Sequence, residues 1–145
     1  MRELAYTEIS GLKECLDELA AHHNEVSANF PGQYPKRPAE ETLKGFEKDV
    51  LAGRSRIAVV ESEGRILGFC KADLDGADGA VGYLIVRKNA RGKGYGDLLL
   101  TWALETLKQR GAARIEVRVV DGNDAIGFYE KYGFRVCSHI LGLNV

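Results

Sequence analysis

The chain has 145 residues, of which 45% are hydrophobic and 28% are charged, and its formal net charge is −1 at pH 7. We expect one folded domain over residues 1–145, because this composition is not that of a disordered chain. The near-neutral charge argues against nucleic-acid binding, which needs clustered lysine and arginine. No apolar run approaches the roughly 18 residues of a membrane span, so we expect a soluble, cytoplasmic protein that does not contact a membrane.

The apolar periodicity divides the chain into strands and helices that do not alternate regularly. In chain order, we predict a strand at 4–9, helices at 10–24 and 39–51, strands at 56–61, 66–73 and 81–86, a helix from the loop at 91–96 to about 110, a strand at 114–120, a helix at 124–132 and a last strand at 134–141. Ser10 is the expected N-cap of the first helix. The strand at 81–86 is apolar enough to be buried on both faces.

The predicted order, β-α-α-β-β-β-α-β-α-β, indicates an α/β fold. It is not the regular alternation of a doubly wound fold. We expect a mixed, mostly antiparallel central sheet that is flanked by about four helices.

A glycine-rich loop, Arg-Gly-Lys-Gly-Tyr-Gly at 91–96, lies between a buried strand and a long helix. Unpaired amides and a positive dipole at a helix start stabilise a phosphate, and glycines let it approach the backbone. Arg91 and Lys93 add positive charge. The P-loop pattern is absent, and Asp97 stands where the dinucleotide pattern G-x-G-x-x-G needs its third glycine. A flexible surface loop is the plainer alternative.

Two motifs carry a family resemblance. A strand that ends in Val86 is followed by Arg91, Gly94 and Gly96, and Asn123 precedes Ala-Ile-Gly-Phe-Tyr-Glu-Lys-Tyr-Gly-Phe at 125–134. In order and spacing, these motifs resemble the acetyl-CoA signature [Q/R]-x-x-G-x-[G/A] and the A-I-x-x-Y-E-K-x-G-F signature of the GNAT-type N-acetyltransferase superfamily. The resemblance covers about residues 56–136 and implies a GNAT-like fold.

The resemblance also implies an activity: acetyl-CoA, as co-substrate, gives its acetyl group directly to a primary amine of a small molecule or peptide. The amides of residues 92–97 would hold the pyrophosphate of CoA, and Val86 would hydrogen-bond the pantetheine. The implied cofactor-binding residues are Val86, Arg91, Gly92, Lys93, Gly94, Tyr95, Gly96, Asp97 and Asn123. Such a transfer needs an oriented carbonyl, a proton acceptor for the amine and a proton donor for the leaving thiolate.

Tyr129 is the catalytic residue that the resemblance implies. Its hydroxyl would lie near the sulfur of CoA and act as the general acid toward the departing thiolate. The alternative is that Tyr129 packs in the core with Phe128 and Tyr132, as aromatic residues at this spacing commonly do.

The general base is not identified. Many family members carry a glutamate three residues before the valine that ends the strand, and Tyr83 stands there in this chain. Glu116 alternates with Arg114 and Arg118, which is typical of a cross-paired surface charge.

The segment His-His-Asn-Glu at 22–25 ends the first helix and lies beside the loop at 30–38. In the family, the first two helices and their connection wall the acceptor site, so we expect His22, Glu25 and Tyr34 to contact the acceptor. A favourable dipole at the helix C-terminus is the alternative reason for the histidines. No metal site is expected, because adjacent histidines face different directions and the three cysteines are far apart.

Two other functions stay open. The first is a non-catalytic acyl-CoA-binding sensor or scaffold domain, which the missing carboxylate at Tyr83 would suit. The second is a nucleotide-binding module that uses the same loop, although neither nucleotide fingerprint fits. The C-terminal stretch at 136–143 could pair with a second chain to give a homodimer if it forms a sheet edge.

Overall fold

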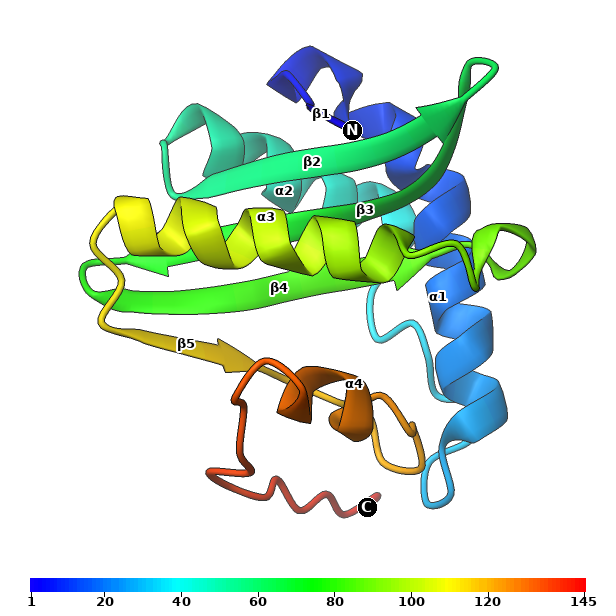
Figure 1. Cartoon of the computed structure of the whole chain (residues 1–145). Coiled ribbons are helices and arrows are strands. Elements are labelled where there is room, and N and C mark those ends of the chain that lie inside the picture. Colours follow the sequence, from blue (N-terminus) through cyan, green and yellow to red (C-terminus); the bar gives the residue numbers. More distant parts are fainter.

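A computed structural model describes residues 1–145 as a five-stranded sheet with helices on both faces (Figure 1). In chain order, the elements are β1 (Arg2–Glu3), the 3-10 helix η1 (Tyr6–Leu12), α1 (Lys13–Val26), α2 (Ala39–Leu51), β2 (Ser55–Ser62), β3 (Arg65–Asp75), β4 (Asp78–Val86), the 3-10 helix η2 (Lys88–Ala90), α3 (Tyr95–Gln109), β5 (Arg114–Val117) and α4 (Ile126–Glu130). The strands lie in the order β1-β2-β3-β4-β5. Only β4 and β5 run parallel, so the predicted mixed, mostly antiparallel sheet is confirmed.

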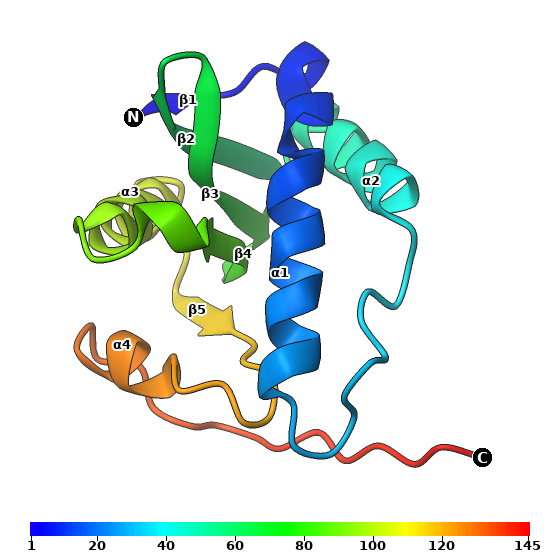
Figure 2. The same ribbon diagram turned by 90° about the vertical axis from the view of Figure 1, so that its right-hand side faces the viewer.

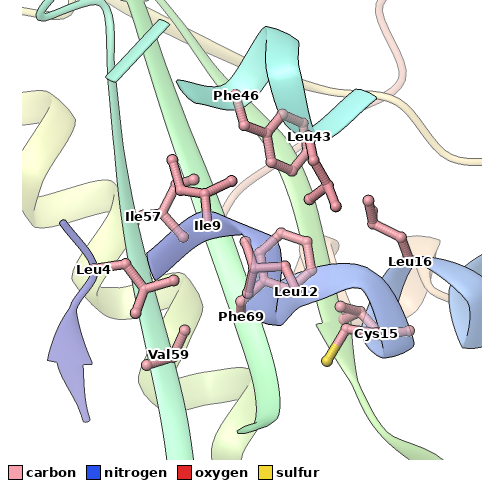
Figure 3. Packing of buried hydrophobic residues seen from close by; sticks show 11 residues of the cluster. Leu4, Ile9, Leu12, Cys15, Leu16, Leu43, Phe46, Ile57, Val59 and Phe69 are labelled. Carbon is pink, nitrogen blue, oxygen red and sulfur yellow. The ribbon is translucent and has the colours of Figure 1, made fainter. Parts of the chain in front are cut away.

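The sheet separates two apolar clusters (Figure 2). On one side, η1, α1 and α2 cover the strands, and Figure 3 shows how Leu12 and Phe69 meet in this cluster. On the other side, α3 buries Leu99 and Leu107 against the sheet. Phe69 and Cys70 are neighbours in β3 but belong to different clusters, because successive side chains of a strand point to opposite faces.

The pairing of β4 with β5 is short. It runs from Asp78 opposite Arg114 to Val81 opposite Val117, and β4 then continues to Val86 without this neighbour. The register of β4 against β3 shifts by one residue at Gly82, which is a β-bulge. The prediction that residues 81–86 are buried on both faces is confirmed in part. Val81 and Ile85 are buried in the two different clusters, whereas Gly82 is exposed and the other three residues are half-buried.

The N-terminal prediction is corrected at the first strand. Instead of a strand at 4–9, β1 is two residues long and η1 follows it. Ile9 and Leu12 are both completely buried. Because they are three residues apart, a helical turn brings both to the core, which a strand cannot do. Ser10 is not an N-cap, because it lies within η1, which runs directly into α1. The N-cap position of α1 is Leu12, whose side chain makes no capping hydrogen bond.

The predicted last strand at 134–141 does not form. The chain from Lys131 to Val145 contains neither strand nor helix. After α4 the tail runs beneath the end of α1 and the α1–α2 connection rather than beside β5 (Figure 2). A contact replaces strand pairing there: the Phe30 ring lies 3.1 Å from where a Cβ on Gly142 would be. Pairing of this tail with a second chain stays a prediction.

The other elements follow the predicted pattern. α2 has the predicted bounds, β2, β3 and β4 are slightly longer than predicted, and β5 and α4 are shorter. No helix is both long and apolar enough to span a membrane.

Two leucines of α3 test the packing. Leu107 is completely buried and Leu98 is 45% exposed. We expect Leu107→Ala to lower the free energy of unfolding by about 2–5 kcal/mol, because it leaves a cavity. The control Leu98→Ala should cost about 1 kcal/mol or less. Equal losses in urea unfolding would contradict this account of α3.

Candidate functional site

A cleft of about 1450 Å³ opens where β4 and β5 part. Its lining comes from distant parts of the chain: the end of α1 and its connection to α2 (19–36), β4 (81–86), the loop and first turn of α3 (90–97), residues 117–129 and the tail (140–144). The cleft therefore joins the glycine-rich loop, the predicted acceptor wall and Tyr129, which the sequence could only place separately.

The N-terminus of α3 forms one wall. Gly94 is its N-cap and has a φ of 81°, which glycine adopts without strain. The first bond of the helix runs from the Leu98 N–H to the Gly94 carbonyl, at 3.1 Å. The N–H groups of Tyr95, Gly96 and Asp97 consequently have no acceptor within the helix. All four residues from Gly94 to Asp97 line the cleft, and a helix start of this kind is able to hold an anion. Binding of a phosphate there stays a prediction.

Charged side chains surround this helix start. Arg91 donates from Nε to the carbonyl oxygen of Val86, at 3.2 Å. Asp97 accepts a hydrogen bond from the Tyr132 hydroxyl, and the Lys131 ammonium lies 3.7 Å from its carboxylate. The negative charge of Asp97 is thus partly balanced by its own neighbours, which reduces its repulsion of an anion at the helix start.

Eight of the nine predicted cofactor-binding residues line the cleft, and Lys93 does not. Asn123 uses its carboxamide oxygen to accept the N–H of Ala125, at 3.0 Å. This bond holds the chain as it enters α4. The carboxamide oxygen of Asn123 therefore serves the backbone, and a contact of Asn123 with a cofactor stays a prediction.

Tyr129 lies both in the core and at the cleft. It is only 8% exposed, and its ring packs edge-on against Phe128 and Phe134 with centroids 5.3 and 5.6 Å away. Burial, and to a smaller extent the neighbouring Cys70, raises the pKa of Tyr129 above its ordinary value. The phenol is therefore protonated at neutral pH and able to donate a proton.

The end of α1 forms the opposite wall. Leu19, His22 and His23 line the cleft, since residues at i, i+3 and i+4 share one helical face. Glu25 lies off this face, is exposed and does not line the cleft. Burial, with a smaller effect from His22, lowers the pKa of His23, which is therefore neutral at pH 7. His23 was not among the predicted site residues, although its position beside His22 was a usable signal.

Tyr34 is fixed beside these histidines. The Asn24 side chain donates to the Tyr34 carbonyl at 2.7 Å and accepts the Tyr34 N–H at 2.8 Å. The Tyr34 ring meets the His23 ring edge-on, with centroids 5.3 Å apart. The α1–α2 connection is thus anchored to α1, and Tyr34 takes its predicted place in the wall.

Asp121 is a residue that sequence reasoning missed. Its carboxylate accepts the Ser27 hydroxyl and the Asn29 N–H, both at 2.8 Å. The N–H of Asn29, and then the Ser27 hydroxyl, lower the pKa of Asp121. At Gly122, with a φ of 78°, a Cβ would lie 2.1 Å from the Val26 carbonyl oxygen. Asp121 and Gly122 therefore hold the chain that follows β5 against the end of α1. In the sequence, the only sign of this contact was that Asp-Gly is a common turn pair.

Glu116 and Tyr83, the two positions considered in the search for a general base, are now placed. Glu116 accepts from Arg114 at 3.0 Å on the surface, as predicted. Tyr83 lines the cleft and packs edge-on against Phe46, with centroids 4.8 Å apart. The general base remains unassigned.

Comparison with known proteins indicates the same family that the two sequence motifs resemble. Residues 19–134 match the acetyltransferase (GNAT) family. An acetyltransferase of Yersinia enterocolitica is 29% identical over 106 residues, which cover 72% of this chain and 75% of that protein.

Two solved structures are similar in fold. The PaiA N-acetyltransferase of Thermoplasma acidophilum, in complex with coenzyme A, has a TM-score of 0.78 and 18% identity, over 96% of this chain and 91% of that one. A predicted acetyltransferase of Clostridium acetobutylicum, with acetyl-CoA, has a TM-score of 0.76 and 18% identity, over 99% of this chain and 94% of that one. At these identities the likeness is one of fold.

The Asp121 anchor makes stability depend on pH. Because its pKa is lower in the folded chain, Asp121 stabilises the fold above the unfolded carboxyl value of about 3.9 and loses this effect as pH falls through the folded value. We expect Asp121→Asn to lower Tm at pH 7 and the deficit to shrink below about pH 4. The control is Asp124→Asn, whose exposed carboxylate lies in the same loop. A deficit that is constant from pH 7 to 3 would contradict the anchor.

Proposed function

The chain belongs to the acetyltransferase (GNAT) family, and on that premise we propose that it binds acetyl-CoA and transfers the acetyl group directly to a primary amine of a small molecule or peptide. One observation carries the proposal: unpaired amides at the start of α3 line the cleft that opens between β4 and β5. The complexes of the two structural neighbours with coenzyme A and acetyl-CoA support the choice of donor.

The residues present fit the pyrophosphate of CoA. The amides of Tyr95, Gly96 and Asp97 supply N–H donors and the positive end of a 15-residue helix. The glycines have no side chains that would stand between these donors and a phosphate. The space beside Gly92 and Gly94 is open, since no atom lies within 4 Å of the position that a Cβ would take. Arg91, beside them, adds a charge that can turn from Val86 toward the phosphates.

The pantetheine arm fits the open edge of β4. Residues 82–86 have no β5 neighbour, so the backbone groups of this edge could bond the amides of the arm as a further strand would. The Val86 carbonyl would be available to the arm once Arg91 turns away from it. The bulge at Gly82 bends β4 where the two strands part. An arm held along this edge would lead the thioester toward the point of separation.

The reaction forms a C–N bond and breaks the C–S bond of the thioester. The sulfur must gain a proton and the amine nitrogen must lose one. Tyr129, whose phenol is protonated at neutral pH, would supply the proton to the sulfur. We assign no residue to the proton of the amine, which a neutral amine can release to solvent after attack.

An acyl-CoA sensor without catalysis is the second candidate. Tyr83, at the position of the family's glutamate, is engaged in aromatic packing with Phe46 and Phe69. A sensor would bind CoA and release no thiol with any amine, whereas an acetyltransferase would release thiol with its acceptor.

The two ends of α3 provide a matched test of the cofactor loop. Gly94 and Gly111 both have positive φ and no atom near a built Cβ, so valine is similarly strained at either. We expect Gly94→Val to weaken CoA binding at least about 10-fold in calorimetry, because it disturbs charge-assisted bonds to phosphate. Gly111→Val should bind CoA like the wild type. Equal affinity in all three proteins would remove the loop as the binding site.

Thiol release from acetyl-CoA with a panel of primary amines tests the activity itself. With an accepted amine, Tyr129→Phe should lower kcat about 10²–10⁴-fold, because the sulfur loses its proton donor. The affinity for CoA should stay unchanged, since the hydroxyl acts on the leaving group. An unchanged kcat would exclude Tyr129 as the acid, and a folded, CoA-binding protein that is inactive with every amine would favour the sensor.

A further inference from the structure

Arg118 occupies a distinctive place in the cleft. The pairing of β4 and β5 ends at Val117, so Arg118 is the first residue beyond the point where the strands part. Val117 and Val119 pack into the cluster on the α3 side of the sheet. Because successive side chains of an extended chain point to opposite faces, we expect the side chain between them to point away from this cluster. Arg118 lines the cleft.

The guanidinium of Arg118 is not used by the chain itself. Arg114, four residues earlier, donates to Glu116, and Arg91 donates to Val86. Arg37, Arg65 and Arg118 are the arginines without a hydrogen bond or ion pair, and of these only Arg118 lines the cleft. A guanidinium carries a planar set of donors that matches a carboxylate or phosphate.

None of the acidic side chains of the cleft pairs with Arg118. Asp97 is engaged by Tyr132 and Lys131, and the carboxylate of Asp121 is occupied by Ser27 and Asn29. Asp124, which is exposed, also lines the cleft. Arg118 has no acidic partner among these residues, so its guanidinium is available to an anionic group of a substrate.

The rest of the acceptor wall is mostly aromatic, and Lys36 carries its one ammonium group. His23 is neutral, and Phe30, Tyr34 and Tyr83 present aromatic rings to the cleft. Lys36 lies 6.0 Å from the Tyr34 ring and is exposed at the outer part of this wall. Arg118 is therefore the cation at the point where the strands part, where the thioester would lie.

We propose that Arg118 binds an anionic group of the acceptor, so that the substrate is an amine that also bears a carboxylate or a phosphate. This inference rests on the proposed acetyl transfer and names the substrate class for the same cleft. Arg118 would hold the anion while the amine meets the thioester, which makes it a specificity-determining residue.

Matched pairs of amines test the proposal in the full-length chain with saturating acetyl-CoA. One set compares α-amino acids with their carboxamides, and the other compares an amino sugar phosphate with the free amino sugar. We expect kcat/KM to be at least about 10-fold higher for the anionic member than for the neutral member in one of the two sets. A preference in the first set identifies the anion as a carboxylate, and a preference in the second identifies it as a phosphate. Arg118→Met should abolish this preference, and Arg118→Lys should keep part of it. Arg114→Met, on the same segment but outside the cleft, should leave it intact.

Three results would overturn the inference: equal use of charged and neutral members, a preference that survives in Arg118→Met, or weaker CoA binding in that variant, which would assign Arg118 to the donor. If no amine releases thiol, the proposed function fails, and calorimetry of the same anionic amines on the CoA-bound protein decides about Arg118. Binding that is lost in Arg118→Met would then support the anion site. No binding to the wild type would refute it.

Discussion

The early end of the β4–β5 pairing is the constraint on which the site depends. Two parallel strands that stayed paired to Val86 would leave no opening between them. Because they part after Val81 and Val117, one edge of β4 is uncovered, and the cleft reaches from the start of α3 to the end of α1. Asp121 then secures the segment after β5 to Ser27 and the neighbouring backbone. Two features thus set the shape of the cleft: the early end of the β4–β5 pairing, and the Asp121 carboxylate, which holds the segment after β5 in place.

Burial and hydrogen bonding decide which groups in the cleft carry charge. Burial disfavours the ionised forms of Tyr129 and His23, so the phenol keeps its proton and the imidazole is neutral at pH 7. The carboxylates of Asp97 and Asp121 accept hydrogen bonds from neighbouring groups. Arg91 and Arg118 line the cleft as well, and Arg118 has no acidic partner in the chain. The cleft thus combines aromatic rings with charged groups of both signs.

Local patterns predicted most of the elements and the position of the glycine-rich loop before α3, and long-range contacts account for several of the failures. The bounds of α2 followed from an apolar stripe between a proline-rich loop and a glycine, and the loop at 91–96 was evident from composition. The predicted strand at 134–141 has a suitable pattern, but strand formation needs a partner edge that the tail does not reach. Asn24 and Asp121 act on segments far away in sequence or through backbone atoms, which leave little local signal. Arg118 looked like an alternating surface charge because only the end of the pairing turns it into a cleft residue.

A crystal structure of the chain with CoA would test the central claim most directly. The account predicts the pyrophosphate within about 3 Å of the amides of residues 94–97, and the pantetheine along β4 between the parted strands. A pyrophosphate bound elsewhere on the protein, with the gap between β4 and β5 filled by side chains, would contradict it.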